Sequence, residues 1–159
     1  KDIKYNFRFT EELDVKWIAH PNWFYKISKY SLPFLKSKYV PDTKFLTDYK
    51  EFPSDPENYI LKPLFSFAGA GVVFDVTKEI LESIEDRSNY ILQKKIQYEP
   101  VIETPDIPAK AEIRLLYVWN DKPMLINNLV RLSKGKMMGV DFNKEKTWVG
   151  SSVAYFNIS

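Results

Sequence analysis

The chain has 159 residues, of which 45% are hydrophobic and 16% aromatic, so it is long and apolar enough to bury a core and is not a disordered segment. Its 23 basic and 21 acidic residues leave a net charge of +2, which is too balanced to predict nucleic-acid binding. The sequence has no cysteine, which excludes disulfides and thiolate chemistry and permits a reducing compartment, and no apolar run reaches the ~20 residues of a membrane helix. We therefore expect a cytoplasmic protein without a membrane or nucleic-acid partner.

The first third of the chain is predicted to contain little regular structure. Residues 1–21 mix charged and aromatic side chains and are predicted to form an irregular arm or a short strand. Asn22 is predicted to cap a helical segment, because the apolar residues from Trp23 to Leu35 lie at nearly helical spacing. The sole histidine, His20, has no second ligand or nucleophile beside it and is interpreted as structural. Residues 44–46 are predicted to form a short strand.

The segment from residue 58 to residue 76 carries the most informative pattern. An apolar run that ends in Lys62 and Pro63 predicts one strand, and residues 72–76 predict a second. A flexible loop lies between them and consists of Ser66, Phe67, Ala68, Gly69, Ala70 and Gly71. Glycine lets backbone N–H groups approach an anion and Lys62 adds a positive charge, so the segment suits a polyphosphate. An ordinary β-hairpin turn would use the same residues, and the segment alone leaves both interpretations open.

Two common nucleotide-binding loops are excluded. The loop is predicted to lead into a strand rather than a helix, which argues against a dinucleotide-binding βαβ unit. It also lacks the Gly-Lys-Ser/Thr sequence of a Walker-type loop.

The remaining elements predict an antiparallel meander. Thr77 is predicted to cap a helix, and residues 90–96 to form a buried strand. A proline-bearing loop at 99–108 follows, and residues 111–119 and 124–132 are predicted to pair as strands around a turn at 120–122. The meander is predicted to continue with a segment at 137–142 and another turn at 143–146. This order of elements predicts an α+β fold.

Four charged residues interrupt apolar runs and are candidate site residues: Lys62, Glu112, Arg114 and Arg131. Glu112 and Arg114 are two positions apart and share one face of their strand, and the hairpin brings Arg131 towards the same face. Such a face, with a glycine loop and a lysine, suits a triphosphate with magnesium. A solvent-facing side of the sheet would show the same alternation, so that alternative stays open.

Asp141 and Asn143 are candidate metal ligands. They lie two positions apart and offer the hard oxygen ligands that magnesium prefers. Asp and Asn are also favoured in turns, which is the alternative interpretation.

In their order along the chain, these motifs resemble the ATP-grasp superfamily. Its members hold ATP between two α+β subdomains, and many join a carboxylate to an amine or thiol through an acyl-phosphate. Lys62-Pro63 and residues 66–72 look like the family's strand lysine and glycine-rich lid, and residues 92–96 look like the hinge strand whose backbone reads the adenine edge. Glu112-Ile113-Arg114 resembles the family's acidic-x-Arg strand, and Val130-Arg131 resembles the arginine that clamps the transferred phosphate. The similarity runs from Asn22 to Asp141.

The resemblance implies two small subdomains with antiparallel sheets: an arm at 1–21, a lid subdomain at 22–98 and a second subdomain at 99–159. It implies ATP and Mg²⁺ as cofactors and a small-molecule or peptide carboxylate as substrate. The residues implied for nucleotide binding are Lys62, Ser66, Phe67, Ala68, Gly69, Ala70, Gly71, Gln93, Lys94, Lys95, Ile96 and Glu112. Arg131 and Arg114 are implied as catalytic, and Asp141 and Asn143 as metal ligands.

Two departures from the family pattern are visible. The helical segment that usually separates the arginine from the metal ligands is missing or reduced, since Arg131 and Asp141 are ten positions apart. Asp141-Phe142-Asn143 stands either for the family's Glu-x-Asn pair or, at Asp141, for its first acidic ligand, and each choice leaves the metal site incomplete. The family's N-terminal domain does not fit before Asn22, and the chain begins at Lys1, so we expect a fragment or a minimal form. The alternatives to a ligase are a nucleotide-binding or interaction module without catalysis and a binding domain without nucleotide.

Overall fold

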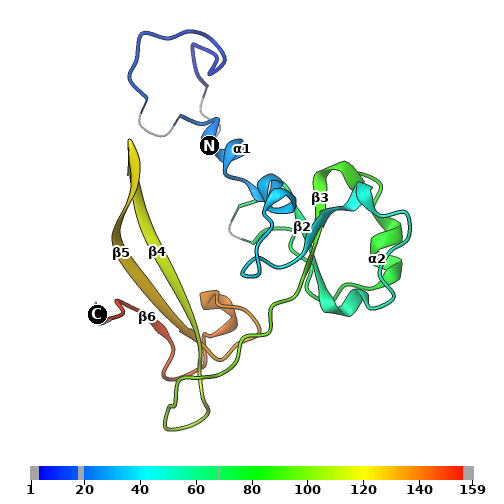
Figure 1. Cartoon of the computed structure of the whole chain (residues 1–159), viewed down its shortest axis with the longest axis vertical. Helices are drawn as coiled ribbons and strands as arrows, with labels where there is room; N and C mark the ends of the chain where they lie inside the picture. Colours follow the sequence, from blue (N-terminus) through cyan, green and yellow to red (C-terminus); the bar gives the residue numbers. More distant parts are fainter. Residues whose placement is uncertain (1–3, 18–19, 68, 156–159) are drawn as a thin grey trace. The chain divides into compact units, whose positions relative to one another are not determined.

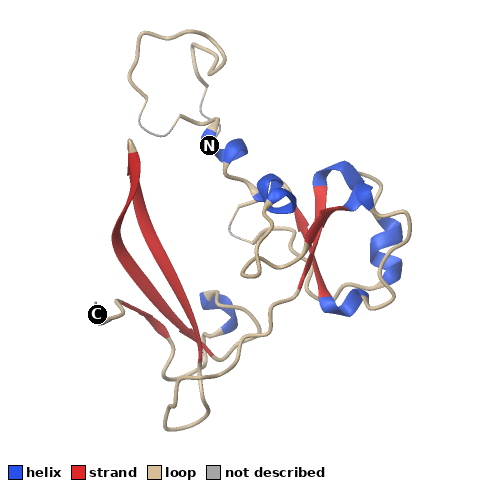
Figure 2. Cartoon of the chain, in the orientation of Figure 1, coloured by secondary structure: helices blue, strands red, loops and turns tan. Residues whose placement is uncertain are grey.

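The computed structural model describes residues 4–17, 20–67 and 69–155, and it divides into two compact units, Lys1–Ile96 and Gln97–Ser159. Each unit contains one three-stranded antiparallel sheet, and the helices are few and short (Figures 1 and 2). The predicted α+β class with two antiparallel sheets is therefore confirmed.

The start of the first unit is irregular, as predicted for the arm. Residues 4–17 contain no helix or strand, and the rings of Tyr5, Phe7 and Phe9 contact one another with centroids 5.2–5.6 Å apart. Two short helices follow, α1 (Trp23–Lys26) and the 3₁₀ helix η1 (Lys29–Phe34).

The sheet of the first unit has the strand order β1-β3-β2, with bounds Thr43–Phe45 (β1), Tyr59–Pro63 (β2) and Tyr90–Lys94 (β3). The strands predicted near residues 44, 60 and 92 are thus confirmed. Short 3₁₀ helices precede or follow the strands: η2 (Leu46–Asp48), η3 (Pro56–Asn58) and η4 (Arg87–Asn89).

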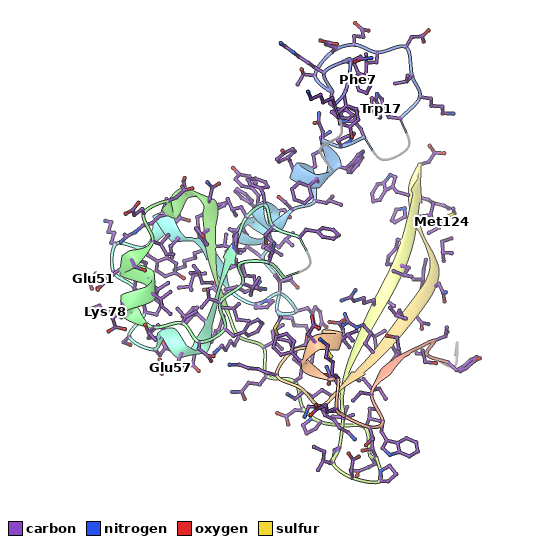
Figure 3. The ribbon with its side chains drawn as sticks, turned by 180° about the vertical axis from the view of Figure 1, so that it is seen from behind. Phe7, Trp17, Glu51, Glu57, Lys78 and Met124 are labelled. Carbon is purple, nitrogen blue, oxygen red and sulfur yellow. The ribbon has the colours of Figure 1, made fainter. Side chains whose placement is uncertain are left out.

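One face of this sheet builds the core. Leu61 of β2 lies opposite Leu92 of β3, and both pack against Leu81 of helix α2 (Lys78–Ser83). These three side chains are completely buried, together with Leu46. The hydroxyl of Thr77 accepts a hydrogen bond from the Ile80 N–H at 3.3 Å, which confirms the predicted cap. Charged residues such as Glu51, Glu57 and Lys78 lie on the outside of the unit (Figure 3).

One local prediction is wrong, and another is confirmed only in part. Residues 72–76 do not form a strand: only Val73 pairs, through two hydrogen bonds of 3.1 and 2.9 Å with Leu61, because the chain then bends towards α2. The glycine loop still does not open into a helix, since α2 begins only at Lys78. Helix α1 begins directly after Asn22, as predicted, but the Asn22 side chain makes no capping hydrogen bond. In η1, by contrast, the Ser28 hydroxyl accepts from the Tyr30 N–H at 3.3 Å.

The second unit is built on a long hairpin of β4 (Lys110–Asn120) and β5 (Lys122–Ser133), to which β6 (Gly150–Ser152) adds a third strand. The predicted turn at 120–122 is confirmed, with Asp121 at a left-handed φ of 56°. The segment at 137–142 is not a meander strand but ends in the 3₁₀ helix η5 (Val140–Phe142). Several apolar side chains of the hairpin are exposed, namely Ile113, Leu115, Trp119, Met124, Leu125 and Ile126.

Candidate functional site

Lys62 lies on the face of the first sheet that points away from the core. Side chains alternate along β2, so the buried Leu61 places Lys62 on the opposite face. There Lys62 Nζ donates to Gln93 Oε1 at 2.5 Å, and Gln93 Nε2 donates to Thr43 Oγ1 at 2.8 Å. A polar row therefore crosses all three strands, and it includes two residues predicted for the nucleotide site, Lys62 and Gln93.

A second lysine, which the sequence did not reveal, reaches the same region. Lys29 Nζ at the start of η1 donates to the backbone oxygen of Ser66 at 2.9 Å and to its hydroxyl at 2.7 Å. Helix η1 is held against this face of the sheet by the rings of Tyr30 and Phe34, which contact Phe45 with centroids 5.2 and 5.7 Å away. No local motif marks Lys29, because its partner lies 37 positions further along the chain.

The electrostatics of this region favour an anion. Burial lowers the pKa of Lys62, and the nearby positive charge of Lys29 lowers that pKa further. Burial also lowers the pKa of Lys29. Among the described residues neither lysine forms an ion pair with a carboxylate, so two half-buried ammonium groups share a site without a counter-charge. A bound anion would relieve both the desolvation and the repulsion.

The predicted glycine loop is a tight turn beside these lysines. The Ala70 N–H donates to the Phe67 oxygen at 2.9 Å, and Gly69 and Gly71 adopt positive φ values of 82° and 70°. A Cβ atom at Gly71 would lie 2.8 Å from Cγ of Pro63, so this position has room only for glycine. Phe67 is 79% exposed, and Ala68 lies outside the described residues.

The predicted hinge is already bonded within the first unit. The N–H of Lys94 donates to the Asp42 oxygen, and the N–H of Lys95 donates to the Asn58 oxygen, both at 2.8 Å. Ile96 is exposed. An adenine ring at the end of β3 would therefore have to form its hydrogen bonds with groups other than the N–H groups of Lys94 and Lys95.

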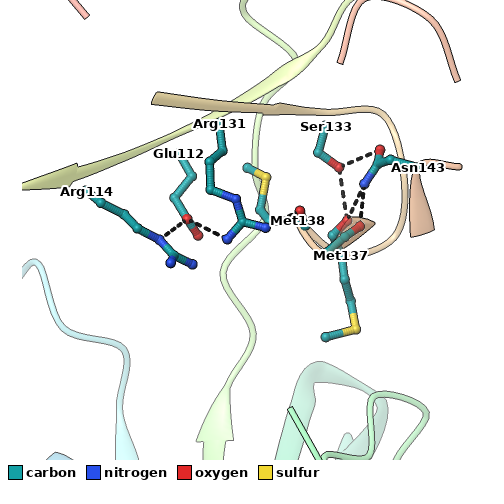
Figure 4. Close-up of polar contacts among 8 residues, drawn as sticks. Glu112, Arg114, Arg131, Ser133, Met137, Met138 and Asn143 are labelled. Atoms are coloured by element: carbon teal, nitrogen blue, oxygen red, sulfur yellow. Dashed lines mark hydrogen bonds and ion pairs between the residues drawn. The ribbon is translucent and has the colours of Figure 1, made fainter. Parts of the chain in front are cut away.

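In the second unit, Glu112, Arg114 and Arg131 share one face of the hairpin, as predicted (Figure 4). Glu112 lies directly opposite Arg131, and its Oε1 accepts from Arg114 Nε at 2.6 Å and from Arg131 Nη1 at 3.4 Å. Arg131 Nη2 also donates to the Met138 oxygen. One carboxylate faces two guanidinium groups, so the cluster retains a net positive charge, which suits a phosphate.

The structure gives Asn143 a structural role (Figure 4). Its Oδ1 accepts three hydrogen bonds of 3.0 Å, from the Ser133 hydroxyl and the N–H groups of Lys134 and Gly135. Its Nδ2 donates to the Met137 and Gly139 oxygens at 3.1 and 2.8 Å. The amide therefore closes the turn after β5, and its oxygen has no lone pair left for a cation.

Asp141 does not join Asn143 in a metal site. Its side chain is 80% exposed and pairs with Lys144 at 2.7 Å, which lowers the pKa of the Asp141 carboxyl. The described residues contain no group of three or more His, Asp or Glu side chains that would hold a metal ion. The predicted pair Asp141 and Asn143 therefore does not fit Mg²⁺, and only Asp141 has a carboxylate to offer.

Comparisons of this chain with protein-family models, with curated proteins and with solved structures gave no match. Within the described part of the chain, no helix has the length and apolar character needed to cross a membrane. The interpretation of the site therefore depends on its own residues.

Proposed function

We propose that this chain binds ATP in the manner of the ATP-grasp proteins that its motifs resemble, as the nucleotide-binding part of an ATP-dependent ligase. The observation that carries the proposal is the pair Lys62 and Lys29, two half-buried cations that lie beside a glycine turn and have no carboxylate partner among the described residues. Such a pair is costly in a folded protein unless it serves to bind an anion. The triphosphate supplies that anion.

The arginine cluster of the second unit supports phosphate chemistry. Arg114 and Arg131 outnumber the single carboxylate between them, and guanidinium groups stabilise charge on a transferring phosphoryl group. In the ligase hypothesis Arg131 contacts the transferred phosphate while a carboxylate substrate attacks it to form an acyl-phosphate. Mg²⁺ enters this proposal with the nucleotide, bound by its phosphate oxygens, and no residue of the chain is assigned to it.

Titration calorimetry of the full chain with ATP and Mg²⁺ tests the binding proposal. We expect saturable binding in the micromolar to millimolar range, and weaker binding of adenosine, because most of the contacts go to the phosphates. No heat of binding at millimolar ATP would contradict the proposal.

A second candidate function is nucleotide binding without catalysis. It is favoured by one observation: the amide of Asn143 is committed to the turn, and Asp141 is paired with Lys144. Incubation with ATP, Mg²⁺ and a panel of carboxylates and amines separates the two functions. Formation of ADP that depends on the added carboxylate supports the ligase, whereas ATP binding without ADP formation supports the binding module.

A further inference from the structure

The second unit contains an open pocket of about 590 Å³, a volume within the usual range for small-molecule sites. Its walls come from the loop at 102–105, from β5 and from the segment at 148–155. The side chains that matter for its chemistry are Ile102, Glu103, Val130, Leu132 and Trp148. The proposed function does not use this pocket.

The pocket lies on the opposite face of the sheet from the arginine cluster. Val130 and Leu132 line the pocket, and Arg131 between them points to the other face because side chains alternate along β5. A ligand here would be separated from Arg131 and Glu112 by the sheet itself. The pocket is therefore a distinct site and not a part of the phosphate-binding surface.

A buried lysine joins two walls of the pocket. The side chain of Lys134 is 1% exposed, and its Nζ donates to Asp106 Oδ1 and to the Thr147 oxygen, the latter at 2.9 Å. The Thr147 hydroxyl donates to Asp106 Oδ2 at 3.2 Å, and the Thr104 hydroxyl donates to Asp106 Oδ1 at 2.8 Å. These contacts attach the 102–107 loop to the residue that precedes Trp148.

The far wall is held by a side-chain amide. Asn128 is 7% exposed, and it both accepts from the Ala154 N–H at 2.7 Å and donates to the Ala154 oxygen at 3.0 Å. In this way Asn128 replaces a backbone pairing and keeps the segment beyond β6 along β5. The pocket is therefore formed in the folded chain without a ligand.

Trp148 is placed at the pocket by an unfavourable backbone conformation. Its φ is 57°, a left-handed value that is rare for a bulky side chain, and the residue is nevertheless 61% exposed. Burial of the ring therefore does not compensate for the strain. Strain of this kind clusters at ligand-binding positions, where it sets the direction of a side chain.

The charge of the lining indicates what the pocket accepts. Glu103 is the only lining side chain that is charged at neutral pH, and it makes no ion pair or hydrogen bond with any other described residue. A free carboxylate and an exposed indole both attract a cation, while the rest of the lining is mainly apolar. We propose that this pocket binds a small apolar amine, with its ammonium group at Glu103 and its hydrocarbon part against Trp148, Val130 and Leu132.

The test uses the full chain labelled with ¹⁵N and follows the indole N–H signal of Trp148 during titration with 2-phenylethylamine. The anion 3-phenylpropanoate, which has a similar hydrocarbon part, is titrated in parallel. We expect a saturable shift of the Trp148 signal and at least about tenfold tighter binding of the amine than of the carboxylate. No saturation by about 10 mM amine, or equal affinity for the two probes, overturns the proposal.

Three variants make the test specific. Glu103→Gln is expected to reduce the preference for the amine over the carboxylate probe to about twofold, since it removes the charge with little change of shape. Glu99→Gln is the matched control, because Glu99 is exposed and does not line the pocket. Trp148→Ala is expected to weaken both probes, with the amide spectrum reporting whether the fold is retained. An unchanged preference in Glu103→Gln, an equal loss in Glu99→Gln, or displacement of the amine by ATP each contradicts a separate amine site.

Discussion

Replacement of Lys62 by methionine tests the proposed nucleotide site directly. Methionine keeps most of the length and apolar character of the lysine stem and removes only the ammonium group. In the folded chain that group donates to Gln93 at 2.5 Å, and burial and the charge of Lys29 both lower its pKa. The substitution therefore separates what the charge does for the fold from what it does for ATP.

The two expected effects differ in size. Loss of the hydrogen bond to Gln93 costs about 1 kcal/mol of unfolding free energy, and removal of the desolvated like charge beside Lys29 offsets it, so we expect a net change below about 1 kcal/mol. For ATP, a charged hydrogen bond to phosphate contributes about 1.5–3 kcal/mol, which corresponds to a roughly 10- to 150-fold higher Kd.

Urea unfolding measures the first quantity and calorimetry with ATP and Mg²⁺ the second. Lys44→Met is the matched control, since Lys44 lies in β1 of the same sheet, separated from β2 by β3, and is exposed. We expect the control to change the Kd for ATP by less than about twofold. An unchanged Kd in Lys62→Met, or an equal loss of affinity in Lys44→Met, refutes the assignment of Lys62 to the phosphate site.

Three other predictions follow from the same structure. ATP affinity should fall as the pH rises from neutral towards 10.5, because the pKa values of Lys62 and Lys29 are both lowered and these lysines lose their protons earlier than an ordinary lysine. Binding should therefore take up protons in that range, and calorimetry in different buffers should show a smaller uptake in Lys62→Met, where only Lys29 remains. Gly71→Ala should lower the unfolding free energy by about 2 kcal/mol, because its φ is 70° and the added Cβ would contact Pro63. Gly69→Ala should lower it by about 1 kcal/mol, because its φ is also positive but no atom lies near the added Cβ; equal losses in urea unfolding would contradict this reasoning. Asn143→Ala should lower the unfolding free energy by about 3 kcal/mol because five hydrogen bonds are lost, and Asn143→Asp should lower it by less. If the unfolding free energy is unchanged and only Mg²⁺-dependent ATP binding weakens, Asn143 is a metal ligand after all.

The sequence by itself determined the elements with a clear period. Apolar runs bounded by turn residues placed β2, β3 and the β4–β5 hairpin, and the two-residue repeat of a strand placed Glu112 and Arg114 on one face. The hairpin turn at Asp121 then brought Arg131 opposite Glu112. These predictions depend on neighbours in the chain or on a short turn, so local pattern was sufficient.

Tertiary structure alone decided the features that join distant residues. The apolar residues at 72–76 looked like a strand, but only Val73 finds a partner, because the rest of the segment turns towards α2. Asn143 looked like a metal ligand, but the free N–H groups of the turn after β5 take its oxygen. In both cases the alternative partners were visible only once the chain had folded.

The same reason explains what the sequence concealed about binding. Lys29 reaches the proposed phosphate site only because η1 packs on the sheet. The pocket at Trp148 likewise depends on the Lys134–Asp106 pair, which joins two loops. A sequence determines which residues alternate and where turns favour reversal, since these properties are local. Which charged side chains lack a carboxylate or cationic partner is a property of packing. Among the described residues this property marks the half-buried Lys62 and the exposed Glu103 as candidate ligand-binding residues.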